Sequence, residues 1–301
     1  MATVSLRGIY AMLVTPFDSR EEIDYGALRA EVDWCADQGA QGVVATPSIG
    51  EFACLTNEER WKCFEVVSQQ CDKHPGLQKI ATVAGTHTRE VSQHCKVALE
   101  LGYHAAQLIP PYYWVPDEDE VYRHFQLAAE TGLPIVVYHN PRLSKFHMSR
   151  EFIGRLCEIP GLIALKEVLT DRHVQLEPLY QIVDNRLSIF HTFRVFTTGL
   201  TLGSAGGFIN VFALPATIKM WQLFNEKREP QRMELIQNKI NEVFMRGGED
   251  NKRHIGTTKM CSSLVTGIDM GTPRSPYLLP PDSALERLKQ KLPELQALCD
   301  I

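Results

Sequence analysis

The sequence has no long apolar run and no strong excess of charge of one sign, and each absence excludes a class of protein. No stretch approaches the ~20 consecutive apolar residues that a membrane-spanning helix needs. The formal net charge is −5, with 36 acidic and 31 basic residues interspersed along the chain. This balance gives no electrostatic basis for binding nucleic acid or an anionic membrane. We therefore expect no nucleic-acid partner and no membrane association.

The cysteines lack the spacings of a metal site or of a disulfide framework. There are eight, at positions 35, 54, 63, 71, 95, 157, 261 and 299, with no CxxC pair and no Cys/His zinc pattern. Several fall on apolar helix faces, which favours free, buried thiols in a reducing compartment. The N-terminal apolar run ends at Pro16, which indicates a strand and a turn rather than a signal peptide. We expect a cytoplasmic protein without a bound metal.

A strand-then-helix alternation repeats along most of the chain. Short apolar runs typical of parallel strands covered on both faces lie at residues 8–15, 42–46, 79–84, 105–109, 134–138, 162–166, 187–191 and 207–213. The amphipathic segments between them carry helix starts such as Asp24 and Thr56 and helix ends such as Gly39 and Gly102. These eight units predict an α/β fold, a (β/α)8 TIM barrel.

The alternative fold is a doubly wound open sheet. Such a sheet usually carries a glycine-rich phosphate turn after its first strand, but residues 15–18 (TPFD) contain no glycine. After Pro230 the strand signal disappears, and residues 231–246, 252–266 and 282–299 are predicted helices. We therefore divide the chain into a barrel domain, residues 1–225, and a C-terminal region of three helices, residues 226–301.

Lys166 is the first candidate for chemistry, because a parallel barrel gathers functional groups where its strands end. It follows the apolar run 162–165 (LIAL), where an ammonium is costly to bury. Burial favours the neutral amine, which can attack a carbonyl group to form an imine. The alternatives are a lysine that reaches out of the barrel mouth and one that pairs with Glu167.

Tyr138 and Ser48 are the next candidates. Tyr138 ends the preceding strand, and its phenol could move protons during imine formation; the alternative is a packing tyrosine. Ser48 follows Pro47 and precedes Gly50. Its hydroxyl could relay a proton, and amides around Gly50 could hold a carboxylate. An ordinary serine turn is the alternative at this position.

Together these residues resemble the dihydrodipicolinate synthase / N-acetylneuraminate lyase family of Schiff-base aldolases. The resemblance covers nearly the whole chain, with landmarks at residues 13–17 (LVTPF), 48–51 (SIGE), 55–59 (LTNEE), 111–113 (PYY), 138–141 (YHNP) and 164–167 (ALKE). It implies that Lys166 forms an imine with pyruvate without any cofactor, that Tyr138 is the general acid/base, and that Ser48 connects it to Tyr113. It also implies that the backbone of Ile209 approaches the 2-oxo acid.

The resemblance further implies a homotetramer built as a dimer of dimers, because in relatives the tyrosine matching Tyr113 reaches into a neighbouring subunit's site. Two departures concern substrate choice. Ile49 replaces the second hydroxyl of the usual motif, so a side-chain donor to the pyruvate carboxylate is lost while the backbone amide remains. We expect Ile49 and Gly50 to be substrate-binding residues. Leu143 stands where the synthase has an arginine that grips a second carboxylate, and Arg142 is displaced by one position, which argues against synthase activity.

Residues 138–146 (YHNPRLSKF) resemble the hydratase-aldolase branch of the family, which handles arylidene-pyruvates, although Glu167 stands where that branch is expected to carry a tyrosine. Asn140 is then a substrate-binding residue, and Trp114, Phe193 and Phe212 would form an apolar or aromatic pocket. We predict a class I aldolase, a lyase acting on pyruvate and an aldehyde. The alternatives are dihydrodipicolinate synthase, a sugar-acid lyase or dehydratase, and a non-catalytic protein that binds a 2-oxo acid.

Overall fold

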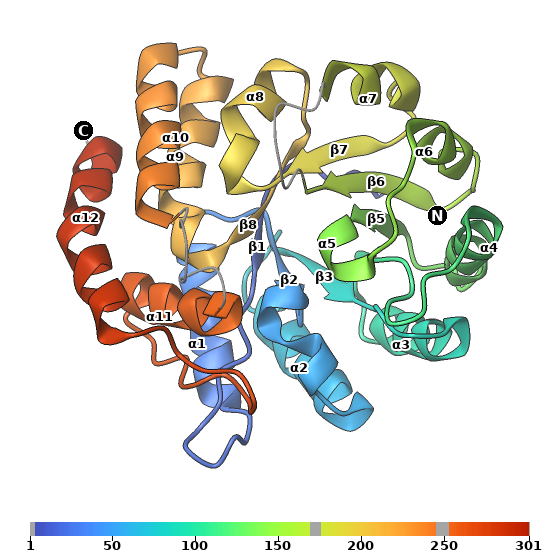
Figure 1. Cartoon of the computed structure of the whole chain (residues 1–301), viewed down its shortest axis with the longest axis horizontal. Helices are drawn as coiled ribbons and strands as arrows, with labels where there is room; N and C mark the ends of the chain where they lie inside the picture. The colour runs from blue at the N-terminus through green and yellow to red at the C-terminus, as the bar shows by residue number, and fades with distance from the viewer. Residues whose placement is uncertain (1–3, 169–175, 245–252, 301) are drawn as a thin grey trace.

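Eight parallel strands close into a barrel, in the order β1 to β8, in the computed structural model of the chain (Figure 1). The structure describes residues 4–168, 176–244 and 253–300. The strands are β1 (Gly8–Met12), β2 (Gly42–Ala45), β3 (Gln78–Thr82), β4 (Ala105–Leu108), β5 (Ile135–His139), β6 (Leu162–Glu167), β7 (Ser188–His191) and β8 (Gly206–Asn210). The predicted TIM barrel is confirmed, and every strand end lies within three residues of its predicted position.

A helix follows each strand and covers the outside of the barrel. These helices are α1 (Tyr25–Asp37), α2 (Asn57–Cys71), α3 (Thr88–Glu100), α4 (Glu118–Ala129), α6 (Arg150–Leu156), α7 (Leu176–Val183), α8 (Phe196–Thr201) and α9 (Leu214–Asn225), with a single short turn of helix, α5 (Pro141–Ser144), before α6. The predicted starts are confirmed: the Asp24 side chain accepts a hydrogen bond from Ala27 N at 2.9 Å, and Thr56 forms a capping box with Glu59.

Three further helices complete the chain: α10 (Pro230–Phe244), α11 (His254–Thr266) and α12 (Asp282–Asp300). They match the predicted helices, except that positions 245, 246 and 252 lie outside the described residues. In Figure 1 they lie along one side of the barrel, where α10 packs on α9 and α8, and α12 packs on α10 and α9. Helix α11 contacts the 3-10 turns after β2 and β8, η1 (Ser48–Gly50) and η4 (Val211–Ala213). The helical region therefore reaches the carboxyl end of the barrel; the domain boundary at residue 225 stays a prediction.

The barrel interior has an apolar floor and a polar upper layer. Side chains alternate between the two faces of a strand, so every second residue points inward. The middle of the interior is filled by an apolar cluster that includes Tyr10, Val44, Ile80, Val136, Ala164, Phe190 and Phe208. The next inward position toward the carboxyl end is polar on five strands, at Thr82, Gln107, Tyr138, Lys166 and Asn210. Polar groups thus gather at the end of the barrel where such folds place their active sites.

Candidate active site

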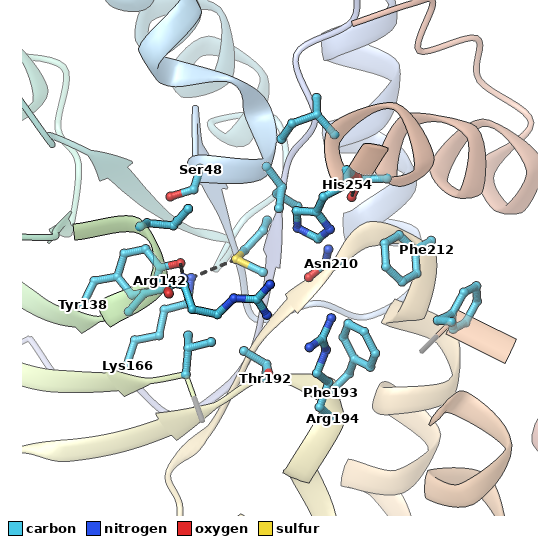
Figure 2. A pocket seen from close by; sticks show the side chains of 18 residues that line it. Ser48, Tyr138, Arg142, Lys166, Thr192, Phe193, Arg194, Asn210, Phe212 and His254 are labelled. Carbon is cyan, nitrogen blue, oxygen red and sulfur yellow. Dashed lines mark hydrogen bonds between the residues drawn. The ribbon is translucent and has the colours of Figure 1, made fainter. Parts of the chain in front are cut away.

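Lys166 projects from β6 into this polar layer (Figure 2). Its side chain is 2 % exposed, and its Nζ donates hydrogen bonds to Gln107 Oε1 at 3.1 Å and to Met12 Sδ at 3.0 Å. Burial lowers the pKa of the amine to about 7, because the charged form loses its hydration. The aromatic ring of Tyr138 also lies close to the amine, with its centroid 4.0 Å from Nζ. A large fraction of the amine is therefore neutral, and nucleophilic, near pH 7.

Glu167 pairs with His139 and not with Lys166, since adjacent residues on a strand point to opposite faces. The register of β5 and β6 sets Tyr138 beside Lys166 and His139 beside Glu167. Glu167 Oε2 lies 2.7 Å from His139 Nδ1, and His139 Nε2 accepts a hydrogen bond from Met148 N at 3.1 Å. Tyr138 and Lys166, which point inward, are thus available for chemistry. His139 and Glu167, which point outward, hold the segment after β5 against the barrel. The sequence analysis gave this outward pair no role.

Tyr138 carries a protonated phenol at neutral pH. Burial raises the pKa of this phenol, and hydrogen-bonding contacts with Asn140 and Ser48 act in the opposite direction. Asn140 Nδ2 donates to the phenol oxygen at 2.8 Å, so the amide fixes where the hydroxyl lies. The Oδ1 atom of Asn140 is buried and has no hydrogen-bond partner among the described residues. Tyr138 lines the cavity and can therefore act first as an acid.

Ser48 opens the 3-10 turn η1, which follows β2 through a strained loop. Its buried Oγ makes no well-formed hydrogen bond within the described ranges, although it lies close enough to Tyr138 to lower the pKa of the phenol. Thr46 and Glu51 take left-handed backbone conformations, with φ of 44° and 59°. Gly50 is required here, because a Cβ would lie 2.8 Å from the Leu13 carbonyl oxygen.

The Gly50 amide donates to the Pro47 carbonyl oxygen at 2.8 Å, so it is not available to a substrate. The backbone amide of Ile49 and the Ser48 hydroxyl form no such bond among the described residues and can serve as donors. The Gly50 carbonyl in turn accepts a hydrogen bond from Thr15 Oγ1 at 2.6 Å, which holds the turn against the end of β1.

A cavity of about 320 Å³ opens above Lys166. Figure 2 shows Ser48, Tyr138 and Lys166 along one side of it and Phe193 and Phe212 along the other. The remaining lining residues are Met12, Ile49, Asn140, Arg142, Leu143, Val168, Thr192, Arg194, Asn210, Phe244, His254, Ile255 and Thr258. The structure thus brings seven predicted site residues to one cavity: Lys166, Tyr138, Ser48, Ile49, Asn140, Phe193 and Phe212. Gly50 and Ile209, which were also predicted site residues, do not line the cavity. The Ile209 side chain packs in the apolar layer between the strands and the helices.

Tyr113 and Trp114 lie at the surface and do not line the cavity of the single chain. Their exposed fractions are 74 % and 80 %, and their rings contact each other edge to face with centroids 5.3 Å apart. Tyr113 has a positive φ of 81°, which turns the chain outward at this point. Trp114 is therefore not a wall of the pocket within one chain, and its predicted place in the aromatic pocket is taken by Phe244.

Two sets of residues around the amine and the cavity were not predicted from the sequence. Met12 and Gln107 contact the amine from β1 and β4, and Gln107 could have been noticed as the polar residue at an inward position of an apolar strand. Phe244 and His254 come from α10 and α11, and no pattern in the chain connects those helices with the barrel mouth. Arg142 also lines the cavity, next to Leu143, so the loss of an arginine at position 143 does not remove positive charge from this wall.

The C-terminal region also holds the loop that carries Ser48. Lys259 on α11 donates to the carbonyl oxygens of Thr15 at 2.6 Å and Met270 at 3.1 Å, and its Nζ lies 3.3 Å from Glu51 Oε1. The backbone amide of Arg274 donates to Glu51 Oε2 at 3.0 Å. Glu51 therefore has a structural role: it fastens the β2 loop to the C-terminal helices.

Comparison with known proteins agrees with this geometry. A sequence model of the Dihydrodipicolinate synthetase family matches residues 5–295. A 4-hydroxy-tetrahydrodipicolinate synthase from Oceanobacillus iheyensis is 28% identical over 204 residues, which cover 67% of this chain and 68% of the relative. An N-acetylneuraminate lyase from Escherichia coli is 32% identical over 215 residues, 69% of each chain.

Solved structures share the fold over nearly the full length. A dihydrodipicolinate synthase from Bacillus anthracis superposes with a TM-score of 0.84 at 23% identity, covering 98% of this chain and 99% of that one. A prophage protein of the dihydrodipicolinic acid synthase family from Escherichia coli K12, in complex with pyruvate, has a TM-score of 0.88 at 19% identity, covering 97% and 99%. Because the family match spans almost the whole sequence, this chain belongs to the dihydrodipicolinate synthetase family of lyases.

Proposed function

We propose that the protein is a class I aldolase that forms an imine between Lys166 and pyruvate, or a pyruvate-like 2-oxo acid, and makes or breaks a carbon–carbon bond to an aldehyde. The Lys166 amine is the observation that carries this proposal. It is buried at the end of a strand, has no carboxylate partner among the described residues, and has a pKa lowered to about 7. A lysine in this state is suited to covalent catalysis on carbonyl compounds.

The proposed chemistry uses one nucleophile and one acid. The neutral amine of Lys166 attacks C2 of the 2-oxo acid to give a carbinolamine, and the Tyr138 phenol donates a proton to the hydroxyl that leaves as water. The Tyr138 phenolate then removes a C3 proton from the resulting iminium to give an enamine. The enamine C3 adds to the aldehyde carbon, and the phenol returns its proton to the new alkoxide oxygen. Hydrolysis of the new imine releases the product and restores the lysine. The iminium is the electron sink, so this scheme needs no metal or organic cofactor.

The turn η1 is the proposed site for the carboxylate of the 2-oxo acid. The Ser48 hydroxyl has no well-formed hydrogen bond among the described residues, and the adjacent Ile49 side chain lines the cavity without offering a donor. The Ile49 backbone amide and Ser48 Oγ would then be the donors. The same hydroxyl would return a proton to Tyr138 between steps.

The opposite wall supports an apolar or aromatic acceptor, as in the hydratase-aldolase branch. Phe193 and Phe212 pack edge to face with centroids 5.6 Å apart, and Phe212 and Phe244 lie 4.6 Å apart. This aromatic wall offers an aryl group a large apolar contact area. The unpaired Oδ1 of Asn140 could accept a hydrogen bond from a hydroxyl next to the bond that is made or broken.

Dihydrodipicolinate synthase activity is the second candidate, and the position of Arg142 favours it. This guanidinium lines the cavity and could bind a second carboxylate despite the leucine at position 143. Steady-state assays with pyruvate and either aspartate semialdehyde or aromatic aldehydes separate the two candidates. We expect a higher kcat/KM with aromatic aldehydes, and a strong preference for the semialdehyde would assign the synthase activity instead.

We also propose a cytoplasmic homotetramer assembled as a dimer of dimers. The exposed Tyr113 and Trp114 support this proposal, because two large aromatic side chains on one surface loop are suited to a contact between subunits. Within the described residues no helix is long and apolar enough to span a membrane. Sedimentation velocity measures the assembly directly: we expect a tetramer for the parent chain, and a monomer at micromolar concentration would contradict it.

Hydrogen exchange at C3 of pyruvate tests the proposed function without an acceptor. In deuterated buffer the enzyme should replace the methyl protons of pyruvate with deuterium, because enamine formation is reversible, and the loss of the methyl signal can be followed by NMR. A Lys166→Met chain should give no exchange above the uncatalysed rate. Exchange at the parent rate in this variant would show that the chemistry proceeds without the imine.

A further inference from the structure

Gln107 is a fully buried side chain that contacts the proposed nucleophile and has no part in the chemistry above. It lies on β4 in register with Thr82 of β3 and Val136 of β5. Its Oε1 accepts a hydrogen bond from Lys166 Nζ at 3.1 Å, and its Nε2 donates to Thr82 Oγ1 at 3.4 Å. A reversed amide could pair with the neutral amine only by donating to its lone pair, which would then be unavailable for attack. With the carbonyl oxygen of Gln107 toward Lys166, the lone pair stays available.

The number of acceptors around the amine matches the neutral form. A neutral amine has two N–H groups and one lone pair, whereas an ammonium has three N–H groups and no lone pair. Among the described residues Nζ has two hydrogen-bond acceptors, Gln107 Oε1 and the weaker Met12 Sδ. When both N–H groups are held, the lone pair stays free. An ammonium would direct its third N–H group into the cavity, where no further side-chain acceptor contacts it among the described residues.

Charged groups near the amine are few. The phenol of Tyr138 faces it from β5, while Arg142, Arg194 and His254 lie on the cavity wall. The other neighbouring strands, β1, β4, β7 and β8, present the uncharged side chains Met12, Gln107, Phe190 and Phe208. No carboxylate lines the cavity in the part of the chain that the structure describes. The amide of Gln107 thus holds the amine without supplying a countercharge that would favour the ammonium.

We propose that Gln107 is a positioning residue that holds one N–H group of the Lys166 amine and thereby orients the lone pair of the neutral amine toward the cavity. The benefit of this arrangement to the enzyme rests on the proposed imine chemistry. The contact itself can be tested without any substrate, because a charge introduced at position 107 would change the pH at which the amine becomes reactive.

Three variants separate the role of the acceptor from that of packing. Gln107→Met keeps the length of the side chain and removes the acceptor, and Gln107→Glu replaces the amide with a carboxylate. Gln78→Met is the matched control, since Gln78 is another interior amide, bonded to the Tyr10 hydroxyl at the opposite end of the barrel. Melting temperatures establish that each chain is folded.

The first measurement is acetylation of Lys166 by acetic anhydride as a function of pH, quantified by mass spectrometry against the exposed Lys62. In Gln107→Glu the midpoint should rise by about one pH unit or more, because an opposite charge near an amine stabilises the ammonium. In this variant one proton could sit on the new carboxyl group or on the Lys166 amine. In either case, loss of this proton leaves a buried carboxylate beside a neutral amine, which is why the midpoint rises. The parent and Gln78→Met should share one midpoint.

The second measurement is trapping of pyruvate on Lys166 with cyanoborohydride. Gln107→Met should be trapped roughly 3- to 10-fold more slowly than the parent, the effect of one lost hydrogen bond on the orientation of the amine, with no upward shift of the pH midpoint. If Gln107→Glu keeps the parent acetylation midpoint, or if Gln107→Met is trapped at the parent rate, Gln107 is not a positioning residue. If the acetylation midpoint shifts as expected but the parent traps no pyruvate, the role of Gln107 stands and the imine function is wrong.

Discussion

At the scale of single residues, a buried amine is costly to the fold. The barrel mouth holds Lys166 without a countercharge among the described residues, so folding moves an ammonium, or its neutral form, out of water. Active-site groups of this kind commonly reduce stability in exchange for reactivity. The sequence predicted a catalytic role for Lys166 because a charged residue at the end of an apolar strand is unusual, and the structure shows that this side chain is buried. The sequence did not predict Gln107 and Met12, because contacts across the barrel depend on strands that are far apart in the chain.

Lys166→Met should therefore stabilise the protein. The pKa of Lys166 is lower in the folded chain, about 7, than in the unfolded chain, so the unfolded state binds more protons between these two values. The stability of the parent rises with pH across this window, and that dependence is absent from the variant. We expect the free energy of unfolding of the variant to be higher at pH 7 by on the order of a few kcal/mol, and the difference to shrink toward about pH 10. A difference independent of pH, measured by guanidinium unfolding, would contradict this explanation.

Tyr138→Phe should slow imine formation while leaving the fold intact. General acid catalysis typically contributes about 10²–10⁴-fold, and we expect a loss within this range in the rate of pyruvate trapping. Tyr180→Phe is the control, because the Tyr180 hydroxyl bonds to His191 outside the cavity. A parent-like trapping rate in Tyr138→Phe would remove the phenol from the mechanism.

At the scale of elements, the position of each strand was predictable and the arrangement of the loops was not. Continuous apolar runs mark parallel strands buried on both faces, and helix caps such as Asp24 mark the following helices. Loops take their shape from distant partners: the turn after β2 is held by Lys259, more than two hundred residues further along the chain. No local pattern indicates such a contact.

The contact between Lys259 and Glu51 should be important for stability. Removal of one partner of a buried ion pair leaves an uncompensated charge, which costs about 3–5 kcal/mol, and burial already raises the pKa of Glu51. Lys259→Met should therefore lower the free energy of unfolding. Lys289→Met is the control, because it removes an exposed ion pair with Glu286 that contributes ~0–1 kcal/mol. The decrease in Lys259→Met should be several-fold larger than the decrease in Lys289→Met. Equal effects of the two substitutions in urea unfolding would show that the Lys259 contact is dispensable.

At the scale of the whole molecule, the C-terminal helices form part of the wall of the candidate active site. Their existence was predicted from the helical pattern, but their contribution to the cavity was not, because it arises from the way they pack on the barrel. Phe244 of α10 completes the aromatic wall. His254 of α11 lines the cavity as well (Figure 2). In the prediction from sequence, Trp114 had the place that Phe244 occupies in the structure.

Phe244→Ala should therefore affect the acceptor and not the 2-oxo acid. Loss of an apolar contact of this size is worth about 1–3 kcal/mol, so we expect KM for an aromatic aldehyde to rise roughly 5- to 100-fold. The rate of pyruvate trapping on Lys166 should stay within about twofold of the parent. An unchanged KM for the aromatic aldehyde would show that the acceptor binds elsewhere.

The most direct measurement of the central claim is identification of the residue that pyruvate modifies. The protein is incubated with pyruvate and borohydride, digested, and the modified peptide is sequenced by mass spectrometry. We predict a stable secondary amine on Lys166 alone, formed with a pH midpoint near 7. Modification of another lysine, or an unmodified Lys166 in an enzyme that still turns pyruvate over, would contradict the account.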